Sequence, residues 1–115
     1  MREIKFKRVS VLNKTVCEPM TLLELIEFYA DVVGSFGENK FIQYTGLKDK
    51  NGVEIYEGDI LSIMYNAYFK NFKYQSVVSW NNKSLQYNGL EDVIKLGINI
   101  CEVIGNIYEN KDLLE

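Results

Sequence analysis

The sequence predicts a mainly β (α+β) protein: a small β-barrel-like domain of short antiparallel strands, with one N-terminal amphipathic helix and short terminal helical turns. Three observations support this class. Apolar residues recur at spacing two near the N-terminus, one segment has helical periodicity, and from Lys40 onward short extended runs are separated by glycine and asparagine. The last pattern is typical of a β-meander or barrel.

The size and composition predict one domain over residues 1–115, with a strand-helix portion at 1–39 and a β-rich barrel portion at 40–115. The 115 residues are 47% hydrophobic, 25% charged and 13% aromatic, which is ordinary for a globular protein. The two cysteines, Cys17 and Cys101, have no CxxC spacing and no histidine beside them to complete a zinc set. Reduced thiols are therefore favoured, and a disulfide between them is left open.

The charge and hydropathy patterns bear on partners and location. The net charge of −3 provides no global basic field for nucleic acid, although a local basic patch is left open. The N-terminus lacks the continuous apolar run of a signal peptide, and no segment reaches membrane-spanning length. We expect a cytoplasmic protein of a bacterial cell with no membrane association.

The N-terminal strand is predicted at residues 2–11. Ile4 and Phe6, then Val9 and Val11, lie at spacing two with charged residues between them. This alternation is typical of a half-buried strand.

The clearest helix signal is "TLLELIEFYADVVGSFG", which starts at Thr21. Thr21 as N-cap and Glu24 three residues later form a capping box, and Gly34 follows the end. The expected apolar face is made by Leu22, Ile26, Tyr29 and Val33. Residues 34–40 are the only plausible seam before the β-rich remainder.

Two turns organise the next strands. Residues 40–45 predict a strand, and Asn51-Gly52 suits the central positions of a type I′ hairpin turn before a return strand at 53–56. Glu57-Gly58-Asp59 predicts a second tight turn into a strand at 60–65.

The C-terminal half predicts one more hairpin and a final strand. Residues 74–80 and 83–87 are expected to pair across Asn81-Asn82, with a single helical turn at 90–97. Residues 98–108 predict a strand with a bulge at Gly105. A short helical turn capped by Asn110 closes the chain.

Four acidic residues in the segment 43–61, "QYTGLKDKNGVEIYEGDIL", raise the question of a metal or acid–base site. "DKNGVEIYEGDI" has glycine at the fourth position and isoleucine at the twelfth, whereas an EF-hand loop needs glycine at the sixth and glutamate at the twelfth. A structural role explains more: Asp49 can accept hydrogen bonds from turn amides, and Asp59 can brace the second turn. Glu54 and Glu57 are then expected to face solvent.

The segment 64–75, "MYNAYFKNFKYQ", interleaves aromatic residues with lysines and is called the aromatic–lysine segment below. Such a pattern can stack bases and neutralise phosphates, but alternating aromatics more often fill a core or a subunit interface. The candidate binding surface consists of Tyr65, Tyr68, Phe69, Lys70, Phe72, Lys73 and Tyr74.

Catalytic patterns have little support. The chain has no histidine to serve as base for a serine or cysteine nucleophile, and neither GxxxxGK[ST] nor GxGxxG occurs. We therefore expect a protein that is not an enzyme, without catalytic residues, cofactor or metal. Trp80 is expected in the core beside a hairpin turn.

The segment 43–61 closely resembles the signature of the YopX family of phage and prophage proteins, and "MREIKFK", "VVSWNNKSLQY" and "EVIGNIYENKDLLE" agree with it. We call residues 43–61 the signature segment. The resemblance implies a small β-barrel-like domain encoded among phage accessory genes, with no established activity, cofactor or catalytic residue. It weakens at about residues 8–39 and 64–76. The residues that make the signature turns are Tyr44, Gly46, Asp49, Asn51, Gly52, Tyr56, Gly58 and Asp59.

Two functions follow as hypotheses. The first is a phage or prophage accessory protein that is not an enzyme and binds a phage or host protein through the barrel surface or the aromatic–lysine segment. The alternative is a nucleic-acid-binding accessory module that uses the same segment. Clustered exposed aromatics would also favour a homo-oligomer.

Overall fold

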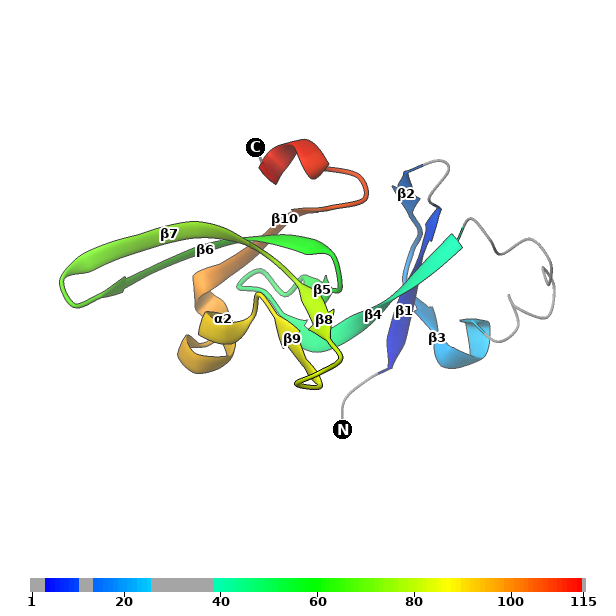
Figure 1. Ribbon diagram of the computed structural model, residues 1–115, viewed down its shortest axis with the longest axis horizontal. Coiled ribbons are helices and arrows are strands. Elements are labelled where there is room, and N and C mark those ends of the chain that lie inside the picture. The colour runs from blue at the N-terminus through cyan, green and yellow to red at the C-terminus, as the bar shows by residue number, and fades with distance from the viewer. Residues whose placement is uncertain (1–3, 11–13, 26–38, 115) are drawn as a thin grey trace.

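The structure is a computed structural model that describes residues 4–10, 14–25 and 39–114 (Figure 1). The protein is mainly β, with a curled, half-barrel-like antiparallel arrangement and short helices, as the sequence predicts. The first sheet has the order β2-β1-β4-β5, and β3 also pairs with β1. The other sheets have the orders β10-β6-β7 and β8-β9.

The elements have the following bounds. The first sheet contains β1 (Lys5–Ser10), β2 (Thr15–Val16), β3 (Met20–Thr21), β4 (Asn39–Lys48) and β5 (Glu54–Tyr56). The second contains β6 (Asp59–Ala67), β7 (Lys70–Val77) and β10 (Cys101–Asn106), and the third contains β8 (Ser79–Asn81) and β9 (Gln86–Asn88). Helix α2 spans Glu91–Leu96, and 3₁₀ turns span Ile98–Ile100 and Lys111–Leu114.

The N-terminal strand is confirmed as β1, which pairs with β2, β3 and β4. Residues 2, 3 and 11 of the predicted range lie outside the described residues. The half-buried position expected for Ile4 is wrong: it precedes the strand and is exposed, because pairing begins only at Lys5.

The helix start is confirmed at Thr21. Residues 22–25 are helical, the N–H of Glu24 donates to Thr21 Oγ1 at 3.2 Å, and the Thr21 hydroxyl donates to Glu24 Oε1 at 3.1 Å. Leu22, expected on the apolar face, is exposed. Ile26, Tyr29, Val33, Gly34 and residues 35–38 of the seam lie outside the described residues.

The predicted type I′ turn at Asn51-Gly52 is wrong. Only Gly52 has positive φ, at +82°, and its N–H donates to the carbonyl of Asp49 at 3.0 Å, so the turn starts at Asp49. The physical reason is the Asp49 side chain, which accepts the N–H groups of Asn51 and Val53 and fixes a longer loop. The return strand is confirmed as β5.

A primed turn occurs instead at the β6–β7 hairpin, where residue preferences do not predict a turn. Tyr68 and Phe69 have φ of +52° and +63°, and they alone separate the paired residues Ala67 and Lys70. Two successive residues with positive φ in a two-residue loop define the I′ class. The strand predicted from Tyr74 therefore begins earlier, at Lys70.

The second predicted hairpin is confirmed only in part, as β8–β9. Residues 74–77 of its first predicted strand belong to β7 and pair with β6, and the turn, residues 82–85, is longer than Asn81-Asn82. Asn81 pairs with Gln86 inside the ladder, and its side-chain oxygen accepts the N–H groups of Lys83 and Ser84. Leu85 completes the turn with φ of +55°.

The C-terminal elements follow the prediction with two corrections. The strand begins at Cys101, because Ile98–Ile100 form a 3₁₀ turn after α2. The bulge is confirmed by a register shift between Val103 and Gly105. The Asn110 side chain does not cap the last turn: its oxygen accepts the N–H of Asn106 at 3.2 Å.

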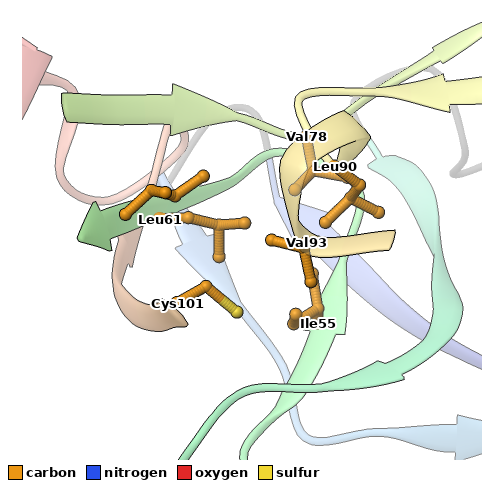
Figure 2. Packing of buried hydrophobic residues seen from close by; sticks show 7 residues of the cluster. Ile55, Leu61, Val78, Leu90, Val93 and Cys101 are labelled. Atoms are coloured by element: carbon orange, nitrogen blue, oxygen red, sulfur yellow. The ribbon is translucent and has the colours of Figure 1, made fainter. Parts of the chain in front are cut away.

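Two buried clusters hold these sheets together. The larger joins α2 to the second sheet through Ile55, Leu61, Ile63, Val78, Leu90, Val93 and Cys101 (Figure 2). The smaller lies between β1, β4 and β5 and contains Val9, Ile42, Tyr44 and Tyr56. The signature segment contributes to both clusters, since Ile55 lies in one and its neighbour Tyr56 in the other.

Candidate functional site

The first signature turn is organised by the buried carboxylate of Asp49, which is 1% exposed. Its Oδ1 accepts the N–H groups of Asn51 and Val53, each at 2.9 Å, and its Oδ2 accepts the N–H of Val103 at 2.8 Å. Burial alone would raise the pKa of Asp49, but these three backbone hydrogen bonds outweigh it and lower the pKa. Asp49 thus ties the turn to β10, and the predicted structural role is supported.

The second signature turn contains Asp59, which is 6% exposed. Its Oδ2 accepts the N–H of Tyr56 at 2.7 Å. Burial raises the pKa of Asp59 to about 6, and this one backbone hydrogen bond and the charge of Lys7 only partly oppose the shift. Asp59 braces the turn as expected, at an electrostatic cost when it is ionised.

Gly58 allows the second turn to lie against the C-terminal segment. It has φ of +85°, and a Cβ added there would lie 2.5 Å from Cε2 of Tyr108. Its carbonyl accepts the N–H of Ile107, and its N–H donates to Val78. The turn therefore joins three parts of the chain.

The aromatic members of the signature are structural. Tyr44 and Tyr56 are buried with ring centroids 5.5 Å apart, and the ammonium of Lys7 lies 4.3 Å from the centroid of the Tyr56 ring. Gly46 has φ of +91° within the irregular stretch of β4. These residues hold β4 against β5.

The expectation that Glu54 and Glu57 simply face solvent is wrong. Glu54 forms an ion pair with Lys5 at 2.6 Å. Burial alone would raise the pKa of Glu54, but the hydrogen bonds from Lys5 and Tyr56 outweigh it and lower the pKa. Glu57 Oε1 accepts the N–H of Gln43 at 2.9 Å. Glu54 thus binds a side chain of β1, and Glu57 binds the backbone of β4.

Among the described residues, no group of three or more His, Cys, Asp or Glu side chains is placed to hold a metal ion. Within the same ranges, no helix is long and apolar enough to cross a membrane. Cys17 and Cys101 are not joined: Cys101 is buried, and Cys17 Sγ accepts a hydrogen bond from Arg8. Burial raises the pKa of the Cys101 thiol, which disfavours its reactive thiolate.

The aromatic–lysine segment is the β6–β7 hairpin, which extends from the body as a two-stranded arm (Figure 1). Tyr65 and Phe72 stack with centroids 5.0 Å apart. The hydroxyls of Tyr65 and Tyr74 donate to Asp92 of α2, and burial together with this carboxylate raises the pKa of Tyr74. These three rings support the arm.

The tip of the arm is different. Tyr68 is 88% exposed and Phe69 is fully exposed, and both have positive φ. The structure therefore divides the five aromatic residues of the candidate surface into three supporting rings and two exposed rings at the tip.

The two lysines of the segment lie on opposite faces. In the β6–β7 ladder Lys70 pairs with Ala67 and Lys73 pairs with Met64. The two lysines are therefore three residues apart on one regular strand, which is an odd number. Successive strand residues point to opposite faces, so the arm does not present one face with both lysines. Still, residues 60–90 contain three lysines and none of the chain's 16 acidic residues.

The expected core position of Trp80 is wrong. It is 41% exposed and lines a hollow of about 210 Å³ with Gln43, Glu57 and Tyr87. A second hollow of about 350 Å³ shares Glu57 and Trp80 and includes Lys40, Gly58 and Tyr108. Period-two alternation could not show which face of β8 is covered, so the sequence pattern missed this site beside the signature turn.

The fold and these turns define a class: a small antiparallel β protein whose buried aspartates and glycine turns are structural. A sequence model of the YopX protein family matches residues 2–115. The chain belongs to the YopX family.

Comparison with solved structures supports the fold. The crystal structure of protein EF1440 from Enterococcus faecalis is similar over the whole of both chains, with a TM-score of 0.61 and 20% sequence identity. At this identity the similarity establishes the fold alone. A search of curated proteins finds no match.

Proposed function

We propose that this protein is a phage- or prophage-encoded accessory protein, not an enzyme, that binds a phage or bacterial host protein in the host cytoplasm through the tip of the β6–β7 hairpin. Membership of the YopX family supports the phage-type role. The observation that carries the binding surface is the display of Tyr68 and Phe69 in a primed turn at the end of an extended arm.

The tip is costly for folding, and this favours a binding role. Positive φ disfavours a bulky side chain by about 1 kcal/mol or more per residue, and asparagine and glycine are the usual residues at these positions. Neither ring gains burial in return. Aromatic side chains, in contrast, are common energetic centres of protein interfaces, because each buries a large area with few rotatable bonds.

The alternative, nucleic-acid binding, has support from the absence of acidic residues in 60–90. It is disfavoured by the placement of Lys70 and Lys73 on opposite faces, which leaves few cations beside any stacked base. Fluorescence anisotropy with labelled single- and double-stranded DNA and RNA tests it. Saturable binding that weakens with salt and disappears on replacing Tyr68 and Phe69 would favour nucleic acid over protein.

Two further properties belong to this proposal. The protein acts without a cofactor, and its clustered exposed aromatic residues favour a homo-oligomer. Light scattering at micromolar concentration measures the oligomeric state, and a monomer would contradict the second property.

The experiment compares affinity capture by the wild type with capture by the double variant Tyr68→Asn/Phe69→Gly. The variant removes both rings but keeps a turn suited to positive φ, so we expect the free energy of unfolding to rise by about 1–3 kcal/mol. Tagged protein in induced prophage-carrying cells should retain a stoichiometric protein partner that the variant loses.

The matched control is Leu85→Asn, because Leu85 is also exposed, apolar and at positive φ, but in the β8–β9 turn. It should retain the partner. If the Tyr68→Asn/Phe69→Gly variant retains the partner as well as the wild type does, or no partner is captured, the hairpin tip is not the binding surface.

A further inference from the structure

Four elements meet around the smaller hollow beside the signature turn. Gln43 comes from β4, Glu57 from the turn between β5 and β6, Trp80 from β8 and Tyr87 from β9. The volume of about 210 Å³ fits the end of one side chain rather than a cofactor.

The aromatic walls of this hollow are Trp80 and Tyr87. Their ring centroids are 4.9 Å apart, and the ring planes meet at 69°. They are cross-strand partners in the β8–β9 ladder, so their relative position is fixed by the register. Indole and phenol faces carry negative electrostatic potential and attract cations.

The acidic wall is Glu57, which two hydrogen bonds with Gln43 hold in place. The N–H of Gln43 donates to Glu57 Oε1 at 2.9 Å, and the N–H of Glu57 donates to the carbonyl of Gln43 at 3.1 Å. An ionised carboxylate has about four lone-pair sites, so the bond from Gln43 leaves capacity for further donors. The carboxylate is therefore pre-positioned beside the aromatic rings.

We propose that this hollow binds the guanidinium group of an arginine presented by a partner protein. A guanidinium is planar, stacks on an indole face and donates in a fork to a carboxylate, and Trp80 and Glu57 supply those two partners. A lysine ammonium is more strongly hydrated and has no planar fork, so it should bind this pair of walls more weakly. Lys40 lines the neighbouring hollow and not this one, and its ammonium lies 5.6 Å from the ring centroid of Tyr108.

This inference rests on the proposed function only for the source of the guanidinium, a partner protein. The site does not include the hairpin tip. A peptide test on the purified chain therefore fails or succeeds independently of the capture experiment with the tip variant.

Trp80 is the only tryptophan of the chain, so its fluorescence reports on this hollow directly. Purified full-length protein is titrated with the blocked tripeptide Gly-Arg-Gly and with its citrulline counterpart, which has nearly the same shape but no charge. We expect a saturable change with arginine and at least about tenfold weaker binding with citrulline, the difference between a charged and a neutral donor group. The Gly-Lys-Gly tripeptide should also bind more weakly.

The variant Glu57→Gln removes the charge but keeps an oxygen for the N–H of Gln43, and should weaken arginine binding about tenfold. Glu102→Gln makes the same charge change at a distance from the hollow and should bind as the wild type does. Equal responses to arginine and citrulline, equal binding by Glu57→Gln, or no saturable response would overturn the proposal. Lysine binding as tight as arginine would overturn the assignment to a guanidinium.

Discussion

The two turns of the signature segment use the same residue types with opposite electrostatic results. Asp49 and Asp59 are both buried. Each has a glycine with positive φ in the same turn: Gly52, three residues after Asp49, and Gly58, directly before Asp59. Asp49 accepts three backbone N–H groups and has a lowered pKa, whereas Asp59 accepts one and has a raised pKa. At Asp49 three N–H donors outweigh burial, so the ionised carboxylate stabilises its turn, whereas at Asp59 burial outweighs a single N–H donor.

Asp49→Asn should have the largest effect on this comparison. The amide can replace only one of the two acceptor oxygens and turns an NH₂ group toward a backbone donor. Hydrogen bonds to charged groups contribute about 1.5–3 kcal/mol each, so we expect a loss of about 4 kcal/mol in the free energy of unfolding at pH 7. Urea unfolding measures it, with the exposed Asp112→Asn as control. A loss below about 1 kcal/mol would show that the three bonds do not hold the turn.

Gly58→Ala should follow in size. The added Cβ would lie 2.5 Å from a carbon of Tyr108, and φ of +85° is itself unfavourable for alanine. We expect a loss of about 3 kcal/mol, measured by urea unfolding. If Gly58→Ala/Tyr108→Ala is as stable as Tyr108→Ala alone, the clash accounts for the whole loss, with no contribution from backbone strain.

Asp59→Asn should change stability in the opposite direction to Asp49→Asn. Because the folded pKa of Asp59 is raised, its favourable contribution is present below the unfolded value of 3.8 and is lost as pH rises to about 6. Asparagine avoids this loss, so we expect a gain of about 2 kcal/mol at pH 7 and little difference at pH 3.5. Asp49 has the reverse sign: its contribution is present above its unfolded pKa and is lost as pH falls below it.

Unfolding curves from pH 3.5 to 7 test this sign. The difference between Asp59→Asn and the wild type should grow between pH 4 and 6 and then stay level. A difference that is independent of pH would contradict the raised pKa of Asp59.

Gly52→Ala should have the smallest effect and isolates backbone strain. Gly52 has φ of +82°, but nothing lies within 4 Å of an added Cβ. We expect a loss of about 1 kcal/mol, measured under the same conditions as Gly58→Ala. Equal losses at the two glycines would show that the contact with Tyr108 adds nothing.

Local chemistry explains which parts of this fold could be predicted from sequence. Gly52, Gly58, Asp49 and Asp59 belong to turns whose residue preferences are strong, so the turns were predicted, although the type I′ assignment at Asn51 was wrong. A side chain bonding across the loop overrode the Asn-Gly preference. The capping box at Thr21 was predicted for the same local reason.

The candidate sites were harder to predict because they depend on packing between distant elements. Tyr68-Phe69 has no turn propensity, so its primed turn could not be found from residue preferences. The alternation around Trp80 does not say which face is covered. One signal was available: Lys70 and Lys73 are three residues apart, which places them on opposite faces of any strand.

The hydrogen bond between Asp49 and Val103, which joins residues 54 apart, also covers the edge of the second sheet at β10. β10 is an outer strand of its sheet in the described part of the chain, and its carbonyl at Cys101 accepts the N–H of Lys50. Open strand margins recruit other chains and start aggregation. At the opposite edge of this sheet, the lysines of β7 would repel the β7 strand of a second copy that paired with it in antiparallel orientation. Loss of the Asp49 turn would therefore uncover backbone groups on β10, and we expect such variants to aggregate at a lower protein concentration than the wild type, in addition to being less stable.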